Sequence, residues 1–238
     1  MKKLLIKFIA LSIGITLGIY ASWKINILNE VVGDLGLGTG TSIKSSETSE
    51  NNEYADNLVL INGEYDHFII DLKYATKNNV TKEVLYEKEL AYLQKNTLAK
   101  LIKANEELRA IGYRLKIWDA YRPLYVQKKL WAAYPNANYI ANPFANGSNH
   151  NRGTAVDVTL VDSSGKELEM PTGFDGFGPE SRRGYKWSDE ATKNVKILTD
   201  VMIKYGFTSI NSEWWHFDDE DSAEYSIMDF KFRDLLKK

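Results

Sequence analysis

The sequence of 238 residues contains no cysteine, and this absence removes several kinds of site at once. Without a thiol there is no disulfide framework, no cysteine-ligated zinc ribbon and no cysteine nucleophile. Charge of one sign is also lacking, because 30 Lys and Arg residues face 32 Asp and Glu residues, for a net charge of −2. This balance gives no electrostatic reason to expect nucleic acid as a partner.

Histidine is scarce as well, with only His67, His150 and His216 in the chain. Any transition-metal site must therefore be built from at most three imidazoles together with carboxylates. Apolar residues, by contrast, are plentiful: hydrophobic residues make up 44% of the chain and aromatic residues 12%. This content is sufficient for a buried core, and the length predicts one folded domain or two small ones.

The first 29 residues differ in pattern from the rest of the chain. Lys2, Lys3 and Lys7 precede an uncharged run over residues 8–23, which Lys24 closes. A basic start followed by a short apolar stretch is typical of an export signal. The run is shorter than the roughly 20 apolar residues of a membrane-spanning helix. We therefore expect residues 1–29 to be a signal peptide or an N-terminal membrane anchor, and the protein to be exported, either secreted or anchored.

Residues 30–53 are rich in small and polar residues and have no apolar periodicity. Such a segment cannot bury a face, so we expect a flexible linker. The folded domain is then expected over residues 54–238, a normal size for a single domain.

Helical and extended patterns are interspersed in this predicted domain. Helix caps are expected at Asn96–Thr97 and at Ser188, and Pro123 is expected to open a further helix that runs to about residue 134. Strands are expected at residues 58–61, 68–72, 114–118, 153–160, 207–210 and 214–217. There is no strict βαβ alternation. The order therefore predicts an α+β fold, a single domain with a central antiparallel sheet flanked by helices.

Three residues in two short segments have the chemistry of a metal site. His150 precedes a turn marked by Gly153, Asp157 lies in the strand expected next, and His216 ends a second segment, EWWH. Taken alone, each histidine could equally be an ordinary structural or surface residue, because a single histidine is more often structural than a metal ligand. An unpaired carboxylate in an apolar strand is costly, however, and requires a metal or another partner. Three protein ligands with one open position would be the arrangement of catalytic zinc.

Two further residues are candidates for catalysis. Glu213 lies three positions before His216, and in a flat strand the two side chains would face opposite sides. Both reach one site only if the chain kinks at Ser212 or Glu213, and Glu213 would then be the general base. Arg122 follows an expected strand and is suited to stabilising an oxyanion, although a surface or salt-bridged arginine is the ordinary reading. His67 has no assigned role.

These residues fall into three ordered motifs. S-x-H-x-x-G-x-A-x-D covers residues 148–157, E-x-W-H covers 213–216, and W-D-x-Y-R-P covers 118–123. Together they resemble the D-alanyl-D-alanine dipeptidases, the VanX-type zinc peptidases with a Hedgehog/DD-peptidase-like fold. Residues 71–79 and 170–175 are similar to the dipeptidase branch in particular. The resemblance covers most of the predicted domain.

The resemblance implies roles for the matching residues. It implies one Zn²⁺ per chain on the two histidines and the aspartate named above, with Glu213 as base and Arg122 at the transition state. Asp175 is similar to the acid that receives the free amino group of the substrate, while Ser148 and Tyr74 match pocket positions. A carboxylate suits an ammonium group, and closing this side of a site restricts it to dipeptides.

The implied function is that of a metallopeptidase that hydrolyses the D-alanyl-D-alanine dipeptide, or related D,D-dipeptides, in peptidoglycan metabolism. One alternative is a zinc D,D-carboxypeptidase or endopeptidase acting on stem peptides, and another is a zinc-binding module without turnover. The presence of both Glu213 and Arg122 favours an enzyme. The expected partner is a small D,D-dipeptide, with membrane contact only through the N-terminal segment. That segment departs from the family, whose resistance dipeptidase works in the cytoplasm.

Overall fold

The computed structural model of the chain describes residues 57–63 and 67–236. The predicted export segment (1–29) and linker (30–53) lie outside the described residues, as do the first three residues of the predicted domain. Within the described ranges, no helix combines the length and apolar character of a membrane span.

A five-stranded sheet in the order β2-β4-β5-β7-β6 forms the centre of the fold. Its strands are β2 (Ile69–Ile70), β4 (Tyr113–Asp119), β5 (Ala155–Asp162), β6 (Phe207–Ser209) and β7 (His216–Asp219). All neighbouring strands are antiparallel except β2 and β4, which are parallel. A long crossover joins this pair, as parallel strands require. The fold is therefore the predicted α+β arrangement, with one parallel edge strand as the difference.

The first predicted strand lies outside this sheet. β1 (Leu58–Leu60) pairs with β3 (Tyr92–Gln94) in a separate two-stranded ladder. All three residues of β3 are buried, so the segment lacks the alternation that marks a strand in a sequence. This is why β3 was not predicted.

Four α-helices complete the described part: α3 (Lys95–Ala110), α4 (Leu124–Ala133), α5 (Asp189–Lys204) and α6 (Phe232–Leu235). The predicted cap of α5 is confirmed, because the Ser188 side chain accepts a hydrogen bond from Ala191 N at 3.1 Å. The predicted cap of α3 is wrong. That helix continues directly from β3 with Gln94 at the cap position, and the Thr97 hydroxyl donates instead to Asp219 at 2.6 Å.

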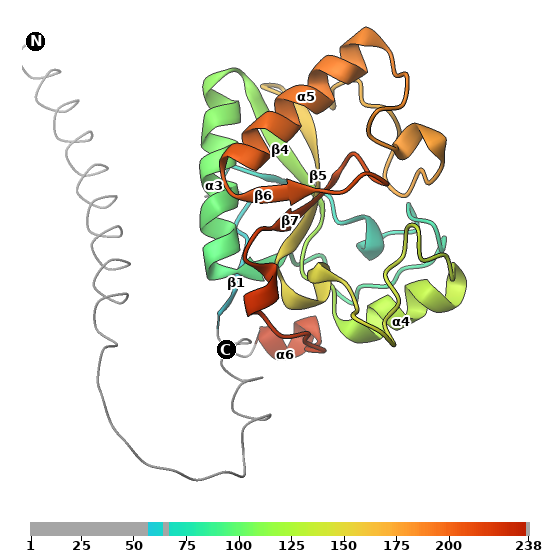
Figure 1. Cartoon of the computed structure of the whole chain (residues 1–238). Coiled ribbons are helices and arrows are strands. Elements are labelled where there is room, and N and C mark those ends of the chain that lie inside the picture. Colours follow the sequence, from blue (N-terminus) through green and yellow to red (C-terminus); the bar gives the residue numbers. More distant parts are fainter. Residues whose placement is uncertain (1–56, 64–66, 237–238) are drawn as a thin grey trace, which may run out of the picture. The chain divides into compact units, whose positions relative to one another are not determined.

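The two long helices lie side by side on one side of the sheet, and α4 lies on the other (Figure 1). Leu101 and Leu108 of α3, with Leu198 and Met202 of α5, are fully buried. They pack in the main hydrophobic core, which leaves the opposite face of the sheet available for polar groups.

An irregularity in β4 aligns polar side chains across that opposite face. The register between β4 and β5 shifts by one residue at Trp118, which is the mark of a bulge. Beyond it, Asp119 lies opposite Asp157, which in turn lies opposite His216 on β7. Directly opposed residues share a face, while their neighbour Val158 points to the other one. The bulge and the register thus place three ionisable side chains in one row.

Candidate active site

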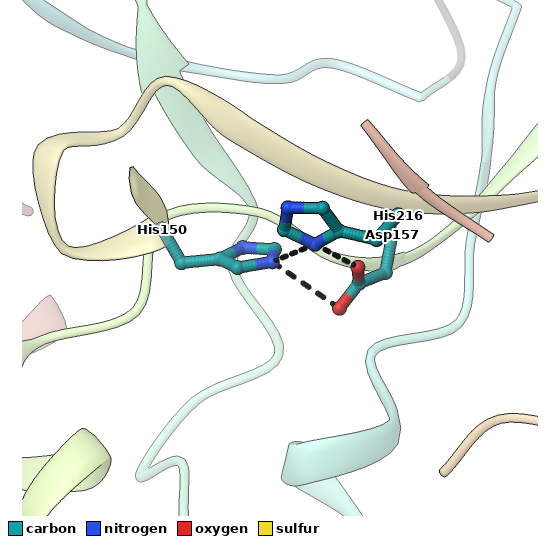
Figure 2. A group of neighbouring side chains, drawn as sticks. All are labelled: His150, Asp157 and His216. Atoms are coloured by element: carbon teal, nitrogen blue, oxygen red, sulfur yellow. Dashed lines mark hydrogen bonds and ion pairs between the residues drawn. The ribbon is translucent and has the colours of Figure 1, made fainter. Parts of the chain in front are cut away.

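Two imidazoles and a carboxylate converge at the start of β5 (Figure 2). His150 Nε2 lies 3.2 Å from His216 Nδ1 and 3.3 Å from Asp157 Oδ2. His216 Nδ1 lies 3.0 Å from Asp157 Oδ1. One donor atom from each residue falls within 4.8 Å of the others, and all three side chains are buried. The structure therefore brings together the three predicted metal ligands.

A short capped turn positions His150. The turn is a 3-10 helix over Asn149–Arg152, and the Ser148 hydroxyl accepts a hydrogen bond from His150 N at 3.3 Å. Gly153 ends the turn with a φ of +70°, a left-handed conformation that favours glycine. A Cβ at that position would also lie 2.7 Å from a methyl group of Leu58. The S-x-H-x-x-G spacing thus encodes the turn that delivers the imidazole to β5.

The nitrogen that each imidazole presents is set by the partner of its other nitrogen. His150 Nδ1 lies 2.7 Å from Ala120 O, a carbonyl that can only accept, so Nδ1 is the donor. His216 Nε2 lies 3.0 Å from the Asp218 carboxylate and is the donor there. His150 Nε2 and His216 Nδ1 are therefore left to bind a cation, with outer partners of the kind that orient metal ligands.

The electrostatics of the cluster also suit a divalent ion. Burial opposes ionisation of Asp157, yet His150 and then His216 hold its pKa well below the usual range. Burial likewise disfavours a charged His216, but the carboxylates of Asp218 and Asp157 raise its pKa well above that of a free imidazole. Two nitrogens and an ionised carboxylate fit the donor set of a zinc site with an open position. Cation binding would be coupled to proton release, since the nitrogen ligand must be neutral.

Glu213 lies in an irregular segment before β7. This strand begins at His216 rather than at residue 214, so the chain is kinked where the sequence predicted. Ser181 holds the segment, because its hydroxyl donates to Ser212 O at 2.8 Å and its carbonyl accepts from Trp214 N at 3.0 Å. Burial, reinforced by neighbouring carboxylates, raises the pKa of Glu213 to about 8. The carboxyl group therefore binds a proton more tightly than a free glutamate does.

Arg122 follows β4 and is only 6% exposed, so it is not a surface arginine. Its Nε and Nη2 donate to Asp119 Oδ2 at 2.9 and 2.7 Å, and its Nη1 donates to Gln127 Oε1 at 2.8 Å. The guanidinium carbon lies 4.9 Å from the ring centre of Tyr74. Nη2 is 3.6 Å from Asp157 Oδ2, which places a permanent positive charge beside the His-Asp-His cluster.

Asp175 presents a further, half-buried carboxyl group from a loop. Its backbone φ of +54° is uncommon for a residue with a side chain and is held by the surroundings. Oδ1 accepts from the Tyr74 hydroxyl at 3.2 Å and Oδ2 accepts from Val80 N at 2.9 Å. Burial raises the pKa of Asp175 to about 7. Burial also raises the pKa of Tyr74, so its phenol remains a neutral donor.

One cavity of about 480 Å³ joins these groups. Its lining includes every predicted site residue: Tyr74, Arg122, Ser148, His150, Asp157, Asp175, Glu213 and His216. His67 lies elsewhere, at a separate hollow with Arg109 and Arg114. The residue without an assigned role is therefore also remote from the cavity.

Sequence reasoning missed residues that hold the site residues in place. Asp119 and Gln127 bind the guanidinium of Arg122, and Asp218 binds His216. Asp119 lies within a motif that was singled out, so a signal was available. Asp218 lies in an acidic run that reads as solvated surface, and Gln127 lies in a helix with no motif at all.

Comparison with known proteins identifies the family of the chain. A family model described as D-ala-D-ala dipeptidase matches residues 55–236. The D-alanyl-D-alanine dipeptidase of Escherichia coli (strain K12) is 37% identical over 164 residues, which cover 68% of this chain and 84% of the relative. That of Enterococcus faecalis is 30% identical over 168 residues, covering 62% and 83%. The chain therefore belongs to the D-Ala-D-Ala dipeptidase family of metallopeptidases.

Proposed function

We propose that this protein hydrolyses the D-alanyl-D-alanine dipeptide, or related D,D-dipeptides, with one zinc ion per chain. The observation that carries the proposal is that two functional groups line one cavity, the His-Asp-His cluster and the half-buried carboxyl group of Asp175. A peptide bond at the first group and a free amino group at the second would define a short substrate, with these two groups at its ends.

Each proposed role follows from the chemistry of the side chain. His150, Asp157 and His216 would hold the zinc ion, which supplies a Lewis acid when bound. Glu213 would take a proton from the attacking water and return it to the leaving amine. Arg122 would stabilise the negative charge that develops on the carbonyl oxygen.

Asp175 would receive the ammonium group of the substrate. Its carboxyl group is oriented by Tyr74 and Val80 before any substrate arrives. Phe177, two residues further along, stacks on Tyr139 with ring centres 4.7 Å apart. Both of these aromatic residues line the cavity, so their stacking holds the Asp175 loop against the segment that contains Tyr139. A loop held in this way would favour a dipeptide over a longer chain.

We further propose that the protein acts outside the cytoplasm, on dipeptides released from peptidoglycan. The support is the basic and apolar pattern of residues 1–29, which is typical of an export signal, whether cleaved or retained. Residues 30–53 would then connect it to the peptidase domain. Fractionation of cells, with detection of the full chain, tests this proposal; recovery in the cytoplasm alone would contradict it.

A paired substrate assay tests the activity. The full chain with zinc is incubated with free D-Ala-D-Ala and with a pentapeptide stem that ends in D-Ala-D-Ala. We expect release of alanine from the dipeptide and little from the stem, because the stem has no free amino group within reach of Asp175. Cleavage of the stem alone would replace the dipeptidase with a D,D-carboxypeptidase. Turnover of neither substrate by the zinc-loaded protein would support a binding module.

A further inference from the structure

Gln127 is a fully buried polar side chain in α4. Burying an amide is costly unless both of its ends form hydrogen bonds. Both ends of this amide do so: Oε1 accepts from Arg122 Nη1 at 2.8 Å, and Nε2 donates to Ala141 O at 2.8 Å. The side chain therefore joins the arginine of the site to another segment of the chain.

The first of these bonds supplies something that Asp119 does not. Both of the hydrogen bonds from Arg122 to Asp119 end on the same oxygen, Oδ2, because the Tyr86 hydroxyl donates to Oδ1. A planar group bound to a single oxygen can still rock about that point. Gln127 binds the guanidinium at Nη1, on the other side of its central carbon, and so provides a second fixed point.

The second bond reaches the wall of the cavity. Ala141 lines the cavity together with Tyr139 and Ile140. The segment 139–141 has no regular secondary structure, so side-chain bonds of this kind contribute to holding it in place. Through one amide, the orientation of the guanidinium is tied to the position of a segment that lines the cavity.

We propose that Gln127 is a positioning residue for the reaction. It fixes the Arg122 guanidinium at a second point and ties it to the wall formed by residues 139–141. The inference rests on the role of Arg122 in the proposed function, since Gln127 acts through that side chain and does not itself line the cavity.

A double-mutant cycle in the zinc-loaded full chain tests the proposal. It compares wild type, Gln127→Met, Arg122→Lys and the double variant on D-Ala-D-Ala. Gln127→Met removes both hydrogen bonds of the amide, the one to the charged Arg122 guanidinium and the one to Ala141 O, so we expect kcat to fall about tenfold. KM should change by less than about threefold, because the loss is felt mainly in the transition state. If Gln127 acts through Arg122, the double variant should be within about twofold of Arg122→Lys.

Controls keep the outcomes separate. Lys128→Met changes the next, exposed residue of α4 and should leave turnover unchanged. Zinc content and circular dichroism verify folding, and if Gln127→Met does not fold, Gln127→Leu, which also lacks both polar ends of the amide, takes its place in the same cycle under the same criterion. The proposal would be overturned if the fold-loss of kcat in the double variant equalled the product of the losses in the two single variants. It would also be overturned if Gln127→Met changed KM alone. If Arg122→Lys retained full turnover, it is the proposed function of Arg122 that would fail.

Discussion

The two ends of the proposed dipeptide site, the His-Asp-His cluster and Asp175, are held by different kinds of structure. At the metal end, Asp157 and His216 are directly opposed on two hydrogen-bonded strands, so the register of the sheet fixes their separation. At the other end, Asp175 lies in a loop and has a backbone φ of +54°. Its carboxyl group accepts hydrogen bonds from Val80 N and from the Tyr74 hydroxyl, which lie 95 and 101 positions earlier in the chain. This difference predicts that mutations at the two ends have different effects. Changes at the strand-held end should stop the chemistry, whereas changes at the loop-held end should alter which peptide is accepted.

The largest effect is expected for the carboxylate beside the metal ligands. Glu213→Gln keeps the shape of the side chain but removes its ability to accept a proton. We expect kcat to fall on the order of 10³-fold, within the usual range for a general base, while zinc remains stoichiometric. Steady-state kinetics and metal analysis of the same sample provide the measurement. A variant within about tenfold of wild type would remove Glu213 from this role.

A smaller effect at the same end is expected from the outer partner of a ligand. Asp218→Ala removes the acceptor that orients His216, and loss of such a partner typically lowers metal affinity about 10- to 100-fold. Competition against a chromogenic chelator measures the affinity for zinc. Asp218→Asn retains an acceptor oxygen and is the matched control, expected to lose less. Equal affinities in wild type and Asp218→Ala would contradict the assignment.

At the loop-held end, the expected change is in KM rather than in kcat. Asp175→Asn removes the charge that would pair with the substrate ammonium, an interaction worth about 1.5–3 kcal/mol. We expect the KM for D-Ala-D-Ala to rise about tenfold or more, with zinc affinity unchanged. If the variant lost its zinc but kept the wild-type KM, Asp175 would support the metal site rather than bind the substrate, and the predicted difference between the two ends would be wrong.

The same carboxyl group gives a pH dependence of smaller size. The pKa of Asp175 is raised by burial to about 7, so the group is ionised above that pH and neutral below it. Only the ionised form attracts an ammonium, and therefore KM should rise as pH falls below about 7. Kinetics between about pH 6 and pH 8 measure this rise. Asp175→Asn should lose that part of the profile, and an identical profile in the variant would assign the titration to another group.

Many of the elements and the residues of the His-Asp-His cluster could be predicted because their signals are local. The turn before β5 is encoded within six residues, from Ser148 to Gly153, and the α5 cap depends on one serine. The kink before β7 followed from requiring Glu213 and His216 to reach the same site. These are short-range patterns that the fold leaves unchanged.

Features that depend on distant pairing could not be predicted. The parallel pairing of β2 and the separate β1–β3 ladder are set by the path of the chain between elements. Asn96 and Thr97 have the composition of a cap, but tertiary contacts engage the Thr97 hydroxyl elsewhere. Gln127 is a common helix residue, and its two bonds only appear once α4 is placed beside Arg122 and Ala141.

The unequal presentation of the two histidines has a consequence for their replacement. His150 offers Nε2, the nitrogen farther from its backbone, whereas His216 offers Nδ1, the nearer one. Among the amide side chains, glutamine places its terminal atoms close to the first position and asparagine close to the second. The two histidines thus offer the same kind of donor atom at different distances from the backbone. The amide side chain that best replaces one of them is therefore a poor replacement for the other. An effort to retune the metal preference would have to treat His150 and His216 as two different residues.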